Sequence, residues 1–211
     1  MDHWEDLAEI LVEEYVAPQG IHDTRILEAM KKIPRHLFIP EEYQEWGYID
    51  SPLPIGEDQT ISQPFMVAKM TELLELRNQD KVLEVGTGSG YQSALLAEMG
   101  MKVTTIERIE ELAEKANEVF QRLSYKIQSI KGDGREGYPP NAQDSWLTQL
   151  EEGGRIVVPL NTQEGVCCLL VRKKTSQGHQ DTWYDYCRFV PLLAGVKKKE
   201  VKPNTKSDTT F

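Results

Sequence analysis

The feature that most constrains the fold is a short apolar segment that runs directly into a glycine-rich turn. Residues 82–90 read Val-Leu-Glu-Val-Gly-Thr-Gly-Ser-Gly, and the pattern predicts a helix immediately after them, at 91–98. Glycines permit the tight turn and let a ligand approach the backbone closely, while the start of the helix offers free N–H groups. A strand, a glycine turn and a helix in this order predict the ligand-binding unit of an open α/β sheet.

Downstream of this turn, short strands and helices alternate. The pattern predicts, in chain order, a strand at 81–85, a helix at 91–98, a strand at 103–106, a helix at 110–123 and a strand at 125–130. This alternation favours βαβ units in a parallel sheet with right-handed crossovers. Apolar segments at 155–159, 166–172 and 183–189 predict further strands. Only a polar loop separates the last two, so we expect an antiparallel hairpin at one edge of the sheet.

The first part of the chain is different in character. Helical spacing of apolar residues predicts helices at 3–16, from Asp23 as N-cap to Pro34, and at 64–76, with an irregular stretch between the last two. We expect one domain over residues 1–195, in which 1–76 form a substrate-side extension and 77–195 the cofactor-binding core. The polar residues 196–211 are expected to be a disordered tail.

Acidic side chains around the turn indicate which cofactor it binds. A P-loop would end in Gly-Lys-Ser/Thr, which is absent, so ATP is disfavoured. Glu84, just before the turn, would repel a pyrophosphate and attract a positively charged sulfonium. Glu107, about 20 residues further on at a strand end, can accept the ribose hydroxyls, and Asp133 after the third strand can reach an adenine edge.

The glycine turn with these acids closely resembles the class I methyltransferase pattern. The resemblance implies a Rossmann-like α/β sheet, mostly parallel with an antiparallel edge hairpin, and S-adenosyl-L-methionine as cofactor. The residues expected to bind it are Glu84, Gly86, Thr87, Gly88, Ser89, Gly90, Glu107, Arg108, Asp133 and Gly134.

A second set of motifs lies upstream. Residues 34–38 read Pro-Arg-His-Leu-Phe, 53–56 read Leu-Pro-Ile-Gly, and 59–65 read Gln-Thr-Ile-Ser-Gln-Pro-Phe. With the glycine turn, these resemble the protein-L-isoaspartate O-methyltransferase family, almost without interruption over residues 23–135 and again over 149–155. The resemblance implies methylation of the α-carboxylate of L-isoaspartyl residues in damaged proteins. It also implies that Ser62 is the active-site residue and that Thr60 lies beside the substrate carboxylate.

The chemistry of this reaction agrees with the residue types. A carboxylate with an ordinary pKa of about 3.9 is already a nucleophile at neutral pH and needs no general base. The hydroxyls of Thr60 and Ser62 can donate hydrogen bonds that orient it. A simpler role for Ser62, as a cap for the following helix, stays open, although no Glu three residues later completes a capping box. We expect His36 to belong to a structural turn.

Overall charge and composition narrow the partners. The chain has 34 acidic and 24 basic residues, a net charge of −10, which disfavours nucleic acid as a substrate. No apolar run approaches the roughly 20 residues that cross a bilayer, and the acidic N-terminus does not resemble a signal peptide. The three cysteines are expected to be reduced. We therefore expect a cytoplasmic monomer that binds isoaspartyl proteins and peptides, without a metal or a membrane.

One segment departs from the family pattern. Between Asp133 and Gly153 the family has a fourth strand that pairs with the first, whereas this sequence has no apolar segment there. On the order of 15 residues are missing. Either the natural protein contains residues that the printed sequence lacks, or the deletion is real; the intact mass of the protein distinguishes the two.

Three functions therefore remain open. The first is the repair methyltransferase. The second is a methyltransferase of the same fold that acts on a small molecule or nucleic acid. The third is an inactive cofactor-binding module that has lost its central strand.

Overall fold

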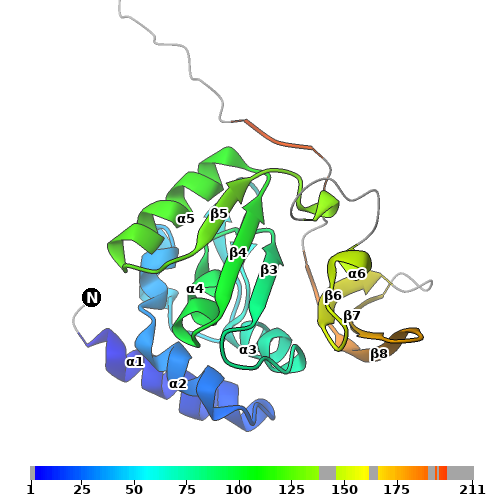
Figure 1. The fold of residues 1–211 in the computed structure, drawn as a ribbon. Helices are drawn as coiled ribbons and strands as arrows, with labels where there is room; N and C mark the ends of the chain where they lie inside the picture. The colour runs from blue at the N-terminus through cyan, green and yellow to red at the C-terminus, as the bar shows by residue number, and fades with distance from the viewer. Residues whose placement is uncertain (1–2, 138–145, 162–165, 190–192, 194, 199–211) are drawn as a thin grey trace, which may run out of the picture.

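The computed structural model of the protein describes residues 3–137, 146–161, 166–189, 193 and 195–198. It forms two three-stranded sheets, one parallel and one antiparallel, with helices around the parallel one (Figure 1). Within the region between Asp133 and Gly153, from which a fourth strand is missing in the sequence, residues 138–145 lie outside the described residues.

The N-terminal region is helical up to residue 46 and then forms a short β-ribbon. In chain order its elements are α1 (Trp4–Ile10), the π-helix η1 (Leu11–Val16), the 3-10 helix η2 (Ala17–Gln19), α2 (Thr24–Lys32), the 3-10 helices η3 (Arg35–Phe38) and η4 (Glu41–Trp46), the antiparallel strands β1 (Leu53–Gly56) and β2 (Gln59–Ile61), and α3 (Pro64–Leu73). Asp23 caps α2 as predicted, because its carboxylate accepts a hydrogen bond from the N–H of Arg25. The ribbon was not predicted from the irregular composition of this region.

The parallel sheet follows the predicted alternation. Its elements are β3 (Lys81–Val85), α4 (Tyr91–Glu98), β4 (Lys102–Glu107), α5 (Glu110–Arg122) and β5 (Gln128–Lys131). The strands pair in the order β3-β4-β5, with Val85 opposite Ile106 and Glu107 opposite Lys131. The carboxyl ends of all three strands therefore lie at one edge, where open α/β sheets bind their ligands.

The largest hydrophobic core cluster joins the N-terminal helices to α4 and α5. Ile26 and Met30 of α2, Leu95 of α4 and Phe120 of α5 all belong to it, and each is at most 3% exposed. Because Phe38 and Ile61 are part of the same cluster, the segments that carry the upstream motifs are fixed to the helices beside the glycine turn.

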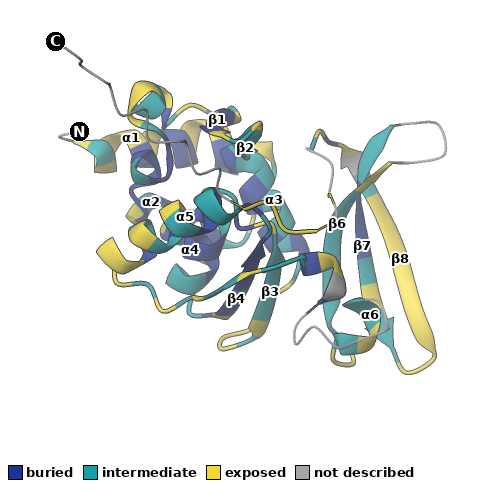
Figure 2. Cartoon of the chain, turned by 90° about the horizontal axis from the view of Figure 1, so that it is seen from above, coloured by how far each residue is buried: buried dark blue, intermediate teal, exposed yellow. Residues whose placement is uncertain are grey.

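The antiparallel sheet contains a longer hairpin than the sequence predicts. After the 3-10 helix η5 (Gly134–Glu136) and α6 (Trp146–Gln149), the strands are β6 (Arg155–Asn161), β7 (Cys167–Thr175) and β8 (Gly178–Tyr186), paired in that order. The stretch 173–181, expected as a polar loop, is mostly strand, because Thr175 pairs with Gly178 across a two-residue turn. β8 is an exposed edge strand that tolerates polar side chains, which is why its polarity was misleading (Figure 2).

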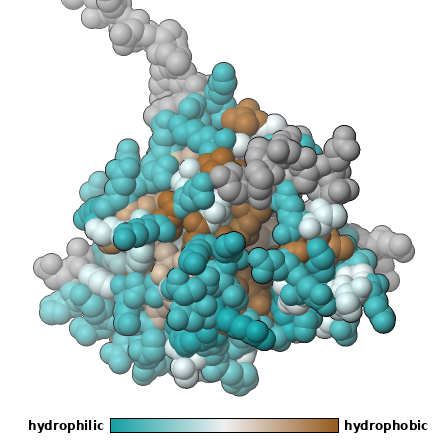
Figure 3. Space-filling model, in the orientation of Figure 1, coloured by the Kyte–Doolittle hydropathy of each residue, from teal (hydrophilic) through white to brown (hydrophobic). Residues whose placement is uncertain are grey.

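No strand within the described residues joins the two sheets. β3 pairs only with β4 and β6 only with β7, so each has one edge without a strand partner there. Both line one cavity of about 2150 Å³, and residues 82–85 and 155–159 are only half-buried, whereas the doubly paired β4 is largely buried. Hydrophobic surface follows the boundary between the two parts (Figure 3). This agrees with the absence of a fourth strand inferred from the sequence.

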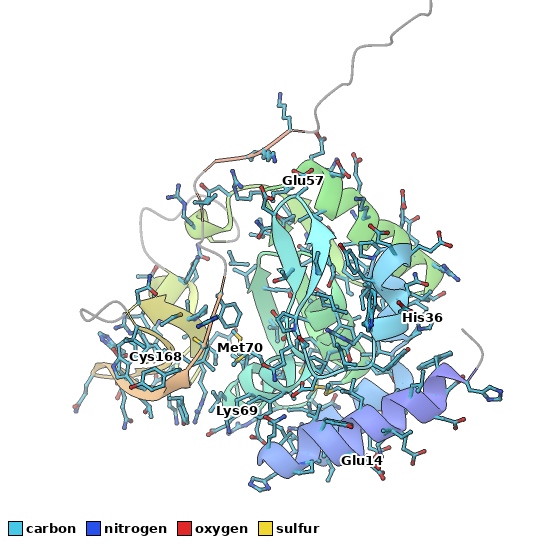
Figure 4. The ribbon with its side chains drawn as sticks, turned by 180° about the vertical axis from the view of Figure 1, so that it is seen from behind. Glu14, His36, Glu57, Lys69, Met70 and Cys168 are labelled. Atoms are coloured by element: carbon cyan, nitrogen blue, oxygen red, sulfur yellow. The ribbon has the colours of Figure 1, made fainter. Side chains whose placement is uncertain are left out.

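The second sheet is held mainly through α3. Leu73 packs in one cluster with Leu169, Val171 and Cys187, and Met70 of α3 packs against the same cluster on the side of the helix that faces this sheet (Figure 4). The guanidinium of Arg155 forms an ion pair with Glu75 just beyond α3. The two sheets therefore contact each other through a helix and not through a ladder of backbone hydrogen bonds.

Candidate active site

The same large cavity gathers nearly all the residues that the sequence nominates. Those that line it are Thr60, Ser62, Glu84, Gly86, Thr87, Gly88, Ser89, Glu107, Arg108, Asp133 and Gly134. They come from the β1–β2 region, the glycine turn after β3 and the ends of β4 and β5. The fold thus brings the substrate-side and cofactor-side motifs to one site, which their separation in sequence does not guarantee.

The glycine turn leaves room for a ligand at its start. Gly86 has φ +91°, and a Cβ added there would meet nothing within 4 Å. Gly88 has φ +54°, and a Cβ added at this position would lie 3.6 Å from Ile55 of β1. The backbone at Gly86 therefore adopts a conformation that favours glycine and is open to close approach. This cradle, with acids beside it, fits the predicted cofactor.

Gly90, the last glycine of the turn, packs against helix α5. It does not line the cavity, and a Cβ added there would lie 2.6 Å from Cε1 of Phe120 and 3.2 Å from Cβ of Ala116. The residue therefore lets the start of α4 approach helix α5 closely.

We expect Gly90→Ala to lower the free energy of unfolding by about 2 kcal/mol, because the methyl group overpacks a filled interface and the backbone there has φ +89°. Gly20→Ala is the matched control: Gly20 has φ +93° but nothing within 4 Å of an added Cβ. It should cost about 1 kcal/mol from backbone strain alone. Urea unfolding of both variants measures the difference. Equal losses would show that the contact with Phe120 is relieved at no cost.

Glu107 is held rigidly at the end of β4. It is 4% exposed, and its Oε2 accepts a hydrogen bond from the N–H of Gly88 at 2.9 Å. Its Oε1 accepts one from the N–H of Ile109 at 2.8 Å. Each carboxylate oxygen can accept a second hydrogen bond. The carboxylate is therefore oriented by the glycine turn itself and keeps acceptor capacity for a pair of hydroxyls.

Glu84 lies in a network of hydroxyl groups. Its Oε2 accepts hydrogen bonds from Ser93 of α4 and from Thr105 of β4, the latter at 2.6 Å. The Thr105 hydroxyl is also 2.6 Å from that of Thr87, which is 3% exposed. Thr87 thus directs its hydroxyl inward and supports the turn. Burial of the carboxyl raises the pKa of Glu84 to about 7, although the hydroxyl donors act to lower it.

This raised pKa predicts a pH dependence of stability. A carboxyl whose pKa is higher in the folded than in the unfolded state opposes folding when ionised, so stability falls as pH rises from the ordinary pKa of 4.5 to about 7. Because the residue is not fully shielded from solvent, we expect a loss of about 2 kcal/mol. Glu84→Gln should remove this part of the profile, which urea unfolding between pH 5 and pH 8 would measure. Parallel profiles for the two proteins would contradict the assignment.

Asp133 is engaged within the protein. Its carboxylate accepts hydrogen bonds from Arg135, at 2.8 Å to Nη2, and from the N–H of Gly195 at 2.7 Å. The Arg135 guanidinium holds the pKa of Asp133 well below its usual range. A contact from this carboxylate to an adenine edge would have to compete with these two partners.

The C-terminal segment at 195–198 crosses the rim of the site. Lys197 donates its N–H to the carbonyl of Arg108 and forms a parallel bridge with Ile109. Its ammonium lies 2.6 Å from Glu57 at the tip of the β1–β2 ribbon (Figure 4). Part of the expected tail thus lies against the site, while residues 199–211 are outside the described ones.

Ser62 does not cap the helix that follows it. The N-cap of α3 is Gln63, which forms no side-chain cap, and Pro64 occupies the first turn. Ser62 is half-buried at the cavity wall, and Thr60 is exposed on β2. Both residues therefore lie at the wall of the cavity, and the simpler capping role of Ser62 is not observed.

Sequence reasoning missed two charged residues beside Ser62. Arg35 is 1% exposed and donates from Nη2 to the carbonyl of Ser62, and Asp50 accepts from Gln63 and from the N–H of Phe65. The available signal for Arg35 was a charged residue two positions before the apolar residues 37–39. His36 packs as expected of a structural turn: its Nδ1 is 2.7 Å from the hydroxyl of Tyr48.

Two classes of feature are absent from the described part of the chain. No group of three or more histidine, cysteine, aspartate or glutamate side chains there could hold a metal ion. Nor does any helix in those residues have both the length and the apolar character needed to cross a bilayer.

Solved structures resemble this fold. One described as protein-L-isoaspartate O-methyltransferase superposes with a TM-score of 0.78 at 27% identity; it covers 91% of this chain, which spans 66% of that one. Another, from Plasmodium falciparum, has a TM-score of 0.73 at 22% identity and covers 88% of this chain and 98% of that one. It is described as a protein of that kind in complex with S-adenosyl-L-homocysteine. At this identity, it supports the fold alone.

Relatives in sequence are closer. Protein-L-isoaspartate O-methyltransferase from Methanoculleus marisnigri is 46% identical, with 88% of this chain and 90% of the relative aligned. Protein-L-isoaspartate O-methyltransferase 1 from Syntrophobacter fumaroxidans is 44% identical, with 87% of this chain and 92% of the relative aligned. The alignment with the Methanoculleus marisnigri relative spans 202 positions, whereas 88% of the 211 residues of this chain is only about 186. That relative therefore has positions without a counterpart in this chain.

The family model of protein-L-isoaspartate(D-aspartate) O-methyltransferase matches residues 7–197, which is most of the chain and includes both sheets, the glycine turn and the Ser62 segment. The geometry of the site and these matches agree. The chain therefore belongs to the protein-L-isoaspartate(D-aspartate) O-methyltransferase family.

Proposed function

We propose that this protein transfers a methyl group from S-adenosyl-L-methionine to the α-carboxylate of L-isoaspartyl residues in damaged proteins and peptides. The observation that carries the proposal is the single cavity that joins Thr60 and Ser62 to the glycine turn and to Glu107. Family membership supports it, and the comparisons give no support to the inactive-module alternative.

The cofactor would be held by the residues around the turn. The open backbone at Gly86 accommodates close approach, and Glu107 is oriented to accept hydroxyl groups. The carboxyl groups of Glu107 and, when ionised, Glu84 add negative charge beside the turn, which favours a sulfonium over a pyrophosphate. When bound, the cofactor supplies a methyl group on a positively charged sulfur that is a good leaving group.

The protein's own task is alignment of the acceptor. A carboxylate is ionised at neutral pH, so no residue needs to remove a proton. Hydroxyl groups at Thr60 and Ser62 can each donate one hydrogen bond and orient the carboxylate without blocking its attack. Correct placement of two reactants can lower the activation free energy by roughly 7–11 kcal/mol. The absence of a histidine from the residues nominated for the site fits this chemistry.

Incubation with methyl-labelled cofactor tests the proposal. Two synthetic peptides of one sequence are compared, one with an L-isoaspartyl and one with an L-aspartyl residue. We expect label only on the isoaspartyl peptide, as a base-labile methyl ester. Label on nucleic acid but on neither peptide would overturn the proposal in favour of a different acceptor.

The proposal includes a cytoplasmic monomer that acts without nucleic acid or a membrane. Support comes from the net charge of −10 and from the three free cysteines. The Sγ atoms of Cys167 and Cys187 are 3.3 Å apart without a bond between them, as suits a reducing compartment. Size-exclusion chromatography with light scattering checks the oligomeric state.

A further inference from the structure

Two charged side chains from different parts of the N-terminal region converge on the segment that contains Ser62. Arg35 belongs to η3, and Asp50 precedes the β1–β2 ribbon. Their hydrogen-bond partners include the carbonyl of Ser62, the side chain of Gln63 and the N–H of Phe65, all at or directly after Ser62. Neither residue lines the cavity, so neither is placed to contact a substrate.

Arg35 links the acceptor segment to the cofactor turn. Its Nε donates to the carbonyl of Gly47 and its Nη2 to the carbonyl of Ser62, each at 3.0 Å. Its guanidinium carbon lies 4.7 Å from the centre of the Tyr91 ring. Tyr91 is 2% exposed and is the first residue of α4, directly after the glycine turn. Burial lowers the pKa of Arg35 to about 10, so the guanidinium stays charged at neutral pH.

Asp50 holds the other end of the segment. Its Oδ1 accepts from the N–H of Phe65 at 2.8 Å, and its Oδ2 accepts from Nε2 of Gln63 at 2.8 Å. Oδ2 also accepts from Nε2 of Gln19, again at 2.8 Å. The carboxylate thus fixes both the first turn of α3 and the side chain next to Ser62.

We propose that Arg35 and Asp50 are positioning residues that clamp the Ser62 segment and set its distance from the cofactor turn. The inference rests on the proposed function, since it concerns the alignment of the acceptor. In-line methyl transfer is sensitive to distance, and a displacement of about 1 Å can cost roughly 100-fold in rate. A clamp with one end on Ser62 and the other on Tyr91 ties together the two halves of this geometry.

The cost of this arrangement argues against a purely structural role. Nη1 of Arg35 is buried and has no hydrogen-bond partner among the described residues. A buried charge is also a poor way to gain stability compared with an apolar side chain of similar volume. The guanidinium does offer something an apolar residue cannot, namely two directed donors and a stacking face at fixed angles.

Asp50 provides the cleaner test because it is only half-buried. We expect Asp50→Ala to lower kcat for the isoaspartyl peptide about tenfold, with the Kd for S-adenosylhomocysteine, measured by calorimetry, within about twofold. Asp50→Asn should recover most of the loss, because its Oδ1 still accepts from the N–H of Phe65. The side-chain amide of Gln63 can rotate by half a turn and accept from the new Asn amide. Asp6→Ala, at a side chain that is 73% exposed, is the matched control and should leave all parameters unchanged.

A second readout does not depend on activity. Amide hydrogen exchange at Phe65 should accelerate about tenfold or more in Asp50→Ala and stay near the wild-type rate in Asp50→Asn. If the wild-type protein fails to methylate the isoaspartyl peptide, the proposed function fails, and this exchange still decides whether the clamp exists. Unchanged exchange in Asp50→Ala overturns the clamp. When the wild-type protein is active, two further results overturn the clamp. One is an Asp50→Ala variant with the kcat of the wild type, and the other is an Asp50→Ala variant that loses kcat and cofactor affinity equally.

Arg35→Lys tests the part of the clamp that Arg35 forms with the carbonyl of Ser62 and the ring of Tyr91. Lysine keeps the charge but cannot reach both carbonyls with fixed geometry or stack in the same way. We expect an approximately tenfold lower kcat with a KM for the peptide within about threefold. A variant that matches wild type in kcat would show that charge alone is required at this position and would overturn the directed-clamp account.

Discussion

Insertion of the segment that the relatives have between Asp133 and Gly153 is expected to raise the free energy of unfolding by on the order of 5 kcal/mol. The inserted strand would pair with the edges of β3 and β6 that no described strand occupies, and would merge the two sheets into one. Residues 82–85 and 155–159, now half-buried, would become buried. Complete burial of one aliphatic side chain stabilises by roughly 1.5–3 kcal/mol relative to exposure, so several partial gains reach this total.

The experiment uses the matching segment of the Methanoculleus marisnigri relative, inserted between Gln143 and Asp144. A glycine–serine segment of equal length at the same place is the control, and it should leave stability unchanged or slightly lower. Urea unfolding followed by circular dichroism gives both the midpoint and the slope. The slope should also rise, because more surface is exposed on unfolding. Equal midpoints for the two insertions would show that β3 and β6 do not act as a strand acceptor.

Ser62→Ala is expected to lower kcat on an isoaspartyl peptide about 100-fold and to leave the Kd for S-adenosylhomocysteine within about twofold. A hydrogen bond to a charged group contributes roughly 1.5–3 kcal/mol, and its loss also frees the carboxylate to rotate away from the line of attack. The hydroxyl forms no cap on α3, so its removal should not disturb folding. Steady-state kinetics and calorimetry on the same preparation give the two quantities.

Ser51→Ala is the matched control, since Ser51 is a neighbouring serine outside the cavity lining. It should keep wild-type kcat. A Ser62→Ala variant that loses cofactor affinity and turnover in equal measure would show that Ser62 serves the cofactor site or the fold. A variant with full turnover would remove Ser62 from the mechanism and leave Thr60 to orient the carboxylate.

Local sequence determined the cofactor half of the site. The strand, glycine turn and helix at 81–98 appear where the pattern predicts them, because this motif depends on residues that are neighbours in the chain. Glu107 is also found at the end of its strand beside the turn, because in-register parallel strands end at the same edge. Here sequence spacing translates directly into spatial position.

One segment was predicted wrongly because its polar residues were taken to indicate a loop. The stretch 173–181 reads as a loop but forms most of a hairpin, because an edge strand needs no apolar side chains on its exposed faces. Thr87 and Gly90 were predicted to bind the cofactor; the structure adds that the hydroxyl of Thr87 bonds inward to Thr105 and that Gly90 packs on Phe120. The sequence shows residue type and spacing, but not the direction of a side chain.

What the sequence by itself determined is the family, the glycine turn and the absence of an apolar strand before Gly153. Only the tertiary structure decided that Arg35 and Asp50 converge on Ser62, and that β3 and β6 line one cavity, each with an edge that no described strand pairs. The physical reason is how far apart in the chain the interacting residues lie. Turns and strand ends are fixed by interactions between near neighbours, whereas a clamp or a gap between sheets arises from contacts between segments far apart in the chain, which depend on how the whole core packs.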